Sequence, residues 1–327
     1  MGAHIFLVSE DNFDICLKHG IYGCVEPSKE WNKAEIIAGL LSIKKGDLIF
    51  FYVKNMGVFG LWILTDEPFL DKTRIWANDN QIFPYRFIFE PVVGDFPKPI
   101  SLSDVLDLHD KGKIWTFDLN PVQQKNQYKI TTGEAKEFIR LLLRNNPVRK
   151  TIKPISDPYI PLSRDQLEIQ LDSRNGRQVN YEGWLNAWFM KSFRDGELID
   201  LFGDYYEYLN LVPTSFNKVM DIFLTHVTTV NGIEILHKYT CIELKTATAS
   251  EKDLSQILRY EDWLARKLAG GDKDMIQSVL IANQFTDTLI DYLWRRHEIE
   301  EKTVRLITYQ FDKEDKCIRL NEMQPMI

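Results

Sequence analysis

The sequence predicts an α+β protein of two domains, a small mixed β-barrel followed by a domain with an αβββαβ core. Three observations lead to this prediction. Residues 1–147 alternate short strand-like runs with turns, whereas residues 163–327 combine longer helical patterns with strands. Between them, residues 148–162 contain three prolines and no periodicity, which is typical of an extended linker. A chain of 327 residues is long enough for two cores of ordinary size.

In the first domain, runs rich in β-branched and aromatic residues are expected to form the barrel strands, and glycine and asparagine supply the turns between them. Two short helices, near residues 11–18 and 134–144, are expected to fit around these strands. The expected strands cover residues 4–8, 47–53, 58–64 and 85–93.

In the second domain, a helix that carries residues 182–189 is expected to precede three consecutive strands. Ser250 then begins a long helix, with Asp253 at the third position of an approximate capping box, and Gly270 and Gly271 end it. The expected strands cover residues 205–212, 219–227, 235–245, 276–282 and 303–310, with a last helix at residues 286–297.

The composition narrows the class of protein. No apolar run approaches the eighteen or so residues of a membrane span, and the first residues lack the pattern of a signal peptide. The four cysteines form no C-x-x-C pair, so we interpret them as reduced thiols of a cytoplasmic protein. A net charge of −7 is unusual for a protein that binds nucleic acid, but a nuclease gathers carboxylates around its metals.

The chemistry is expected where charged residues interrupt apolar strands. Alternate side chains of a strand share one face, so Glu243 and Lys245 are predicted to lie side by side. Asp221 is a lone acid in the apolar strand before them. Two acids and a lysine suit a magnesium site for phosphodiester hydrolysis, because Mg²⁺ prefers oxygen ligands and the ammonium offsets developing negative charge.

This site is consistent only with a particular strand register. The pair Asn231-Gly232 favours a two-residue hairpin turn. With a regular ladder, that turn would place Asp221 on the side of Ile242, away from Glu243. We therefore predict either a three-residue loop or a β-bulge within residues 233–238, which would slip the register by one.

The ordered residues of the second domain resemble the RecB-like branch of the PD-(D/E)XK nuclease superfamily. Asp221 matches the motif aspartate, although Met220 replaces the preceding proline, and Glu243-Leu244-Lys245 matches E-x-K. Gln256 and Tyr260 match Q-x-x-x-Y on the following helix. Glu182 matches the acid of the first core helix, with Glu168 as an alternative.

This resemblance implies a restriction-endonuclease-like fold and a magnesium-dependent nuclease, in which Mn²⁺ would substitute for Mg²⁺. The implied catalytic residues are Glu182, Asp221, Glu243, Lys245, Gln256 and Tyr260, and the implied metal ligands are Asp221, Glu243 and Leu244.

The first domain resembles the EVE family of PUA-like barrels, which are related to the YTH readers. The resemblance is carried by segments in the order of the family, among them residues 4–9, 16–23, 45–54, 58–60 and 84–86. It implies that a modified base is held in an aromatic pocket, where stacking and hydrogen bonds to the base edge select it. The implied base-binding residues are Trp31 and Asn32 in one loop, Trp76 in another, and Ser9 and Asn55.

Together the two resemblances imply a modification-dependent DNA endonuclease, for which a homodimer would suit double-strand cleavage. Two alternatives remain open from the sequence. One is a structure- or mismatch-directed DNA nuclease, in which the first domain only holds the DNA backbone. The other is a non-catalytic reader of nucleic acid. The sequence does not identify the base or its modification.

Overall fold

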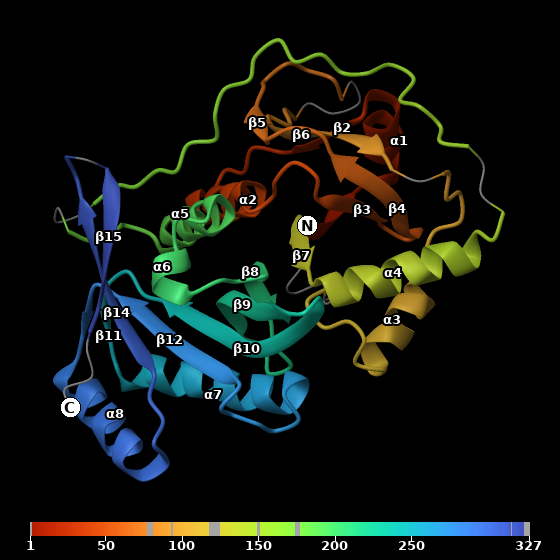
Figure 1. Cartoon of the computed structure of the whole chain (residues 1–327). Coiled ribbons are helices and arrows are strands. Elements are labelled where there is room, and N and C mark those ends of the chain that lie inside the picture. The colour runs from red at the N-terminus through yellow and green to blue at the C-terminus, as the bar shows by residue number, and fades with distance from the viewer. Residues whose placement is uncertain are drawn as a thin grey trace. The chain divides into compact units, whose positions relative to one another are not determined.

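The computed structural model describes residues 2–76, 81–92, 94–117, 125–148, 151–173, 177–314 and 316–323. The chain divides into two compact units, Met1–Glu168 and Ile169–Ile327 (Figure 1). Among the described helices, none is both long and apolar enough to cross a membrane.

The first unit is built on a curled, mixed sheet of seven described strands in the order β2-β6-β4-β3-β1-β7, with β5 paired to β6. The pair β1–β3 is parallel and the other pairs are antiparallel. The elements are β1 (Ala3–Val8), α1 (Glu10–His19), β2 (Ile21–Cys24), α2 (Glu30–Leu41), β3 (Leu48–Val53), β4 (Gly57–Leu64), β5 (Phe69–Leu70), β6 (Tyr85–Pro91), α3 (Leu102–Asp110), β7 (Gln127–Ile130) and α4 (Thr132–Asn145).

Two helices of this unit were not expected from the sequence. The segment that precedes β3 is the helix α2, and seven of its twelve residues are buried. Its apolar residues run almost without interruption, so a helical period is hard to recognise there. The helix α3 begins at Ser101, whose side chain accepts a hydrogen bond from the Asp104 amide. Its pattern is short and lies among prolines and glycines, so the sequence analysis did not identify it as a helix.

The expected linker, residues 148–162, is in part a packed segment of the first unit. The Tyr159 hydroxyl donates to Asp71 at 2.5 Å and accepts from Arg86 at 2.9 Å. Arg86 and Asp71 are both fully buried and lie 3.6 Å apart. The chain beyond the linker continues this packing, since the Leu70 amide donates to the Asp165 carbonyl. The first compact unit ends at Glu168, whereas the sequence suggested that the first domain ends at residue 147.

The second unit contains a six-stranded sheet in the order β15-β14-β12-β10-β9-β8, against which α5 and α7 pack (Figure 1). The central strands β10, β12 and β14 are parallel, and the strands toward both edges are antiparallel. The elements are α5 (Glu182–Asp195), α6 (Ile199–Phe202), β8 (Glu207–Pro213), β9 (Val219–Val230), β10 (Ile233–Leu244), β11 (Thr248–Ala249), α7 (Glu251–Leu268), β12 (Ile276–Ala282), β13 (Gln284–Phe285), α8 (Asp287–Glu300), β14 (Arg305–Asp312) and β15 (Cys317–Glu322).

The αβββαβ order expected from the sequence is present as α5, β8, β9, β10, α7 and β12. The edge strand β15 and the short helix α6 are additions that the sequence did not reveal. Strand β15 has only six residues, three of them exposed, and it begins with two apolar residues and ends with two polar ones, so it lacks the regular alternation that would predict a strand.

The hairpin of β9 and β10 confirms the predicted slip in register. Ile233 pairs with Val230 across a two-residue turn, in which Asn231 and Gly232 have φ values of 51° and 79°. Further along, Leu236 pairs with Val227 but Lys238 pairs with His226. His237 is therefore the extra residue of a β-bulge, and beyond it Ile242 pairs with Ile222. The bulge is the second of the two predicted solutions.

Candidate active site

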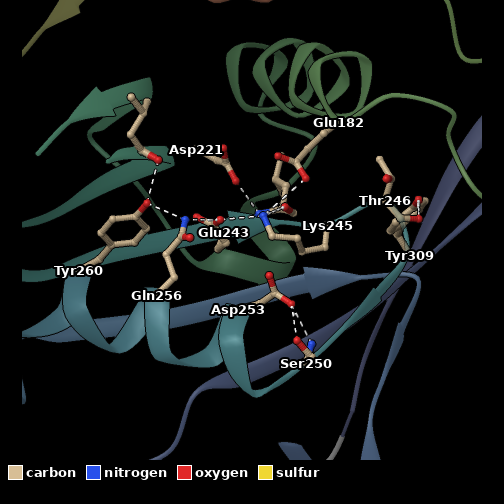
Figure 2. Close-up of polar contacts among 12 residues, drawn as sticks. Glu182, Asp221, Glu243, Lys245, Thr246, Ser250, Asp253, Gln256, Tyr260 and Tyr309 are labelled. Carbon is tan, nitrogen blue, oxygen red and sulfur yellow. Dashed lines mark hydrogen bonds and ion pairs between the residues drawn. The ribbon is translucent and has the colours of Figure 1, made fainter. Parts of the chain in front are cut away.

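Six side chains from five segments of the second unit meet beside the ends of β9 and β10 (Figure 2). Strand β9 supplies Asp221, strand β10 supplies Glu243, and Lys245 follows the end of β10. The helices supply the rest, Glu182 from the first turn of α5 and Gln256 and Tyr260 from α7. The predicted catalytic residues of the second domain thus lie in one place.

The carboxylates of Asp221 and Glu243 lie on the same face of the sheet as a consequence of the bulge. One carboxylate oxygen of Asp221, Oδ2, accepts a hydrogen bond from the Leu244 amide at 2.7 Å. This contact crosses from β9 to the end of β10 and fixes the position of the aspartate relative to β10.

The Lys245 ammonium lies at the centre of the group (Figure 2). It donates to Glu243 Oε1 and to the Leu244 carbonyl, each at 2.7 Å. It also lies 3.5 Å from Glu182 Oε2. The lysine therefore contacts two of the three predicted metal ligands and the predicted acid of the first helix.

The helix α7 holds Glu243 through the side-chain amide of Gln256. Gln256 Nε2 donates to Glu243 Oε1 at 2.6 Å and to the Tyr260 hydroxyl at 2.8 Å. Tyr260 in turn donates to the Val219 carbonyl of β9 at 2.8 Å. Residues four apart share one face of a helix, so both side chains point toward the sheet. They therefore connect α7 to both strands that carry the acids.

The start of α7 is fixed by the predicted capping box. Asp253 accepts from the Ser250 amide at 2.9 Å, and Ser250 caps the amide of the third residue in return. The helix then buries Leu254, Ile257 and Leu264 against the sheet. This local pattern sets the rotation of α7 and hence the direction of Gln256.

Burial dominates the electrostatics of the site. It raises the pKa of Glu182 to about 7, with a further contribution from the Asp221 charge. Burial and the neighbouring carboxylates likewise raise the pKa of Asp221 and of Glu243, although Lys245 acts in the opposite direction. Burial alone would lower the pKa of Lys245, but the surrounding carboxylates raise it. The lysine is therefore charged at neutral pH.

The donor atoms fit a hard divalent cation. Asp221, Glu243 and the Leu244 carbonyl offer only oxygen, and Mg²⁺ is often held by one or two carboxylates with water completing its shell. Glu243 Oε2 is buried and has no hydrogen-bond partner among the described residues, an arrangement that is costly unless a cation or water satisfies the atom. Within the described ranges, no three His, Cys, Asp or Glu side chains converge on one metal position.

Two further residues clarify the role of α5. Glu182 contacts Lys245, whereas the alternative acid, Glu168, lies outside any described helix and is exposed. Asn186, which the sequence analysis missed, is buried and donates to the Asp221 carbonyl at 3.3 Å. Its Oδ1 atom has no partner among the described residues. A polar residue four positions after Glu182 in an apolar helix was the signal that would have identified it.

In the first unit, a pocket of about 430 Å³ brings together two of the predicted base-binding residues. Ser9 precedes α1, and Asn55 stands in the turn between β3 and β4 with a φ of 66°. The sequence analysis missed the remaining lining residues, which combine an aromatic ring with polar and charged groups. They are Leu7, Val8, Glu10, Tyr52, Lys54, Lys125 and Asn126.

The other three predicted base-binding residues do not line this pocket. Trp31 and Asn32 stand in the first turn of α2, where the sequence had suggested a loop. Trp31 is 49% exposed, and the Lys29 ammonium lies 4.7 Å from its ring centroid. Trp76 is only 2% exposed and packs against Phe83, with ring centroids 5.0 Å apart. Its ring is already covered, so this tryptophan is a core residue in the structure.

No protein-family model and no curated protein sequence matches the chain. Among solved structures, human THYN1 protein in complex with 5-methylcytosine-containing DNA is 16% identical and has a TM-score of 0.31. The match covers 43% of this chain and 98% of that chain. A YTH domain of Zygosaccharomyces rouxii MRB1 protein, in complex with N6-methyladenosine RNA, is 12% identical with a TM-score of 0.27, covering 43% of this chain and 84% of that one.

A repair endonuclease from Pyrococcus abyssi is also similar, at 15% identity and a TM-score of 0.25. That match covers 73% of this chain and 76% of the endonuclease. TM-scores this low describe a remote likeness, and the function proposed below is based on the geometry of the site.

Proposed function

We propose that the protein is a metal-dependent endonuclease that cleaves DNA carrying a modified base. The observation that supports the hydrolytic activity most directly is the convergence of Asp221, Glu243 and Lys245, with the buried Oε2 atom of Glu243 lacking a partner among the described residues. A structural ion pair alone would not account for the other acids and the glutamine that meet there.

In this proposal, Asp221, Glu243 and the Leu244 carbonyl would hold Mg²⁺, for which Mn²⁺ would substitute. The cation would supply charge stabilisation for the phosphoryl oxygens. The Lys245 ammonium, fixed by Glu243, would add positive charge at the phosphate and orient the attacking water. Gln256 and Tyr260 would keep Glu243 in position.

The hydrolysis requires a water oxygen to bond to phosphorus while one ester P–O bond breaks. The attacking water loses one proton and the departing alkoxide oxygen gains one. Glu182, with its pKa raised to about 7 by burial, is suited to accept the proton from the water near neutral pH. Its contact with Lys245 keeps it at the site.

The pocket at Ser9 and Asn55 is the proposed base site of the first unit. Its volume of about 430 Å³ accommodates a flipped base, the Tyr52 ring offers an aromatic surface, and the polar side chains offer hydrogen bonds to the base edge. Flipping a base out of the duplex costs least where the base pair is already weakened. The pocket itself would select the base by stacking and by hydrogen bonds to its edge.

The test is digestion of matched DNA duplexes that are unmodified or carry 5-methylcytosine, 5-hydroxymethylcytosine or N6-methyladenine. Each is incubated with Mg²⁺, with Mn²⁺ or with a chelator. Cleavage confined to one modified duplex, dependent on the metal and absent in Glu243→Gln, supports the proposal. Equal cleavage of all duplexes would show that the protein does not recognise a modified base. Absence of cleavage of every duplex would reject the proposed nuclease activity.

A further inference from the structure

A cluster of aromatic rings and one arginine lies next to the candidate active site and is not explained by the roles assigned so far. Phe216 stands in the loop between β8 and β9 and is partly buried. Its ring stacks on Tyr260, with centroids 5.8 Å apart and an interplanar angle of 26°. The ring also lies edge-on to Trp263 at 6.3 Å, and the Arg259 guanidinium lies 4.7 Å from its centroid.

This cluster is connected to the catalytic carboxylate by short contacts. The arginine rests on Phe216, Phe216 stacks on Tyr260, and the Tyr260 hydroxyl accepts from Gln256 at 2.8 Å. Gln256 donates to Glu243 at 2.6 Å. The loop that carries Phe216 also leads directly into β9. The arginine is therefore linked, through Phe216 and Tyr260, to the glutamine that holds the acid.

The charge of Arg259 is not neutralised within the described part of the chain. Its side chain is exposed, and no described carboxylate lies within 4.0 Å of it. Arg296, Arg305 and Arg319 of this unit differ, because each pairs with a glutamate or an aspartate. A stacked guanidinium keeps its donors pointing outward while the ring restricts its motion.

We propose that Arg259 contacts a backbone phosphate of the nucleic acid beside the cleaved bond, and that Phe216 positions its guanidinium for this contact. The inference rests on the proposed nuclease function. A planar guanidinium binds phosphate through two parallel hydrogen bonds, and prior fixation on a ring reduces the entropy lost on binding. Phosphate contacts of this kind set the register of the protein on the strand and are independent of base sequence.

The experiment compares wild type, Arg259→Ala, Arg259→Lys and Arg266→Ala in binding a labelled DNA duplex with Ca²⁺, over salt concentrations from about 50 to about 200 mM. Arg266 lies on the same helix, is exposed and donates to the Asp262 carbonyl, so its removal changes the net charge equally. Loss of one phosphate contact reduces the slope of the logarithm of the binding constant against the logarithm of the salt concentration by about one. We expect the affinity advantage of the wild type over Arg259→Ala to shrink about threefold across this range.

Arg266→Ala should retain the wild-type salt dependence, and Arg259→Lys, which keeps the charge without the planar fork, should fall between the two. Equal behaviour of the two alanine variants would overturn the proposal, as would a wild type that does not bind DNA. Because binding is measured without cleavage, a wild type that binds but never cleaves rejects the hydrolysis while the salt dependence still decides the role of Arg259.

The role of Phe216 is tested by Phe216→Leu and Phe216→Tyr in metal-dependent cleavage and in the same binding series. Tyrosine keeps the ring and should preserve the wild-type salt dependence, whereas leucine, which leaves the guanidinium charge but removes the ring beneath it, should give an intermediate dependence like that of Arg259→Lys. An identical salt dependence in wild type and Phe216→Leu would show that the ring only packs against Tyr260. Arg259→Ala itself should raise KM at least threefold and leave kcat unchanged, since a phosphate contact of this kind is present before and during the reaction.

Discussion

Asp221 and Glu243 face the same side of their sheet, although the tight turn between their strands would by itself place them on opposite sides. The single extra residue, His237, resolves this conflict by shifting the pairing between Leu236 and Lys238. The Asp221 carboxylate then reaches the Leu244 amide at 2.7 Å. The candidate metal site therefore depends on a bulge that lies some distance away along the same two strands.

Deletion of His237 should abolish metal-dependent cleavage. Without the extra residue, the ladder continues in the register set by the turn, and Asp221 falls opposite Ile242 with its side chain on the wrong face. Activity and a crystal structure of the deletion variant would check this expectation.

The matched control is His237→Ala, which keeps the number of residues and hence the bulge. His237 is exposed, so this variant should retain both stability and cleavage. Full activity of the deletion variant would show that the register does not control the site.

Glu243→Gln and Lys245→Met should each lower kcat by a factor of about a thousand or more. The first change weakens the proposed metal site, and the second removes the ammonium 2.7 Å from Glu243, so each loses several kcal/mol of transition-state stabilisation. Cleavage rates with saturating Mg²⁺, measured beside the melting temperature, separate loss of function from loss of folding. A Lys245→Met enzyme with normal kcat would exclude the lysine from the chemistry.

Gln256→Leu should reduce activity by about 10- to 100-fold, as is usual when a residue that orients a metal ligand is lost. The substitution removes the donor to Glu243 Oε1 and the donor to the Tyr260 hydroxyl. The apparent affinity for Mg²⁺, obtained from the metal dependence of cleavage, should weaken as well. Gln256→Glu is the informative companion, because a third negative charge beside Glu243 should be more harmful than the leucine.

The stability of the protein should fall as the pH drops from about 6.5 to about 4, in part because of His226. Burial lowers the pKa of this histidine to about 4, and its Nδ1 atom donates to the Asp204 carbonyl in the neutral ring. In this window the unfolded chain binds a proton that the folded protein does not, so protonation favours unfolding.

Denaturant unfolding at several pH values, with His226→Gln as the comparison, isolates this contribution from that of the carboxylates. The variant should lose less stability than the wild type between pH values of about 6.5 and 4. If the stability of the two proteins falls in parallel over this pH range, the acid sensitivity comes from other groups.

Ser9→Ala should weaken binding of modified DNA by about 1 kcal/mol, the usual contribution of one hydrogen bond, and leave binding of unmodified DNA unchanged. The residue lines the pocket together with Asn55. Trp31→Ala is a useful comparison, because Trp31 is exposed and lies outside the pocket lining. If Trp31→Ala alone affects modified DNA, with a loss of about 1–3 kcal/mol, the base is stacked on α2.

The residues of the candidate active site were more predictable from the sequence than those of the pocket. Glu243, Lys245, Gln256 and Tyr260 occupy consecutive elements, and the two-residue and 3.6-residue periods determine which of them face one another. The same reasoning about the turn predicted the slip in register near residues 233–238.

The pocket was harder to predict because its residues come from separate turns and strand ends. Ser9, Tyr52 and Lys125 are brought together only by the pairing of β1 with β3 and β7, which no local period reveals. Trp76 was misassigned because a tryptophan in a loop suggests an exposed ring, whereas tertiary packing buries it against Phe83.

The packing of Tyr159 onto Arg86 and Asp71 has a practical consequence for dividing the chain into separately expressed halves. A fragment of the first unit that ended at residue 147 would leave the buried pair of Arg86 and Asp71 without the Tyr159 hydroxyl that bridges them, and losing a hydrogen bond to a buried charged group is costly. A half that extends through Glu168 keeps both that contact and the pairing of Asp165 with Leu70. Fusion of the first unit to another protein would, for the same reason, require a junction after this segment.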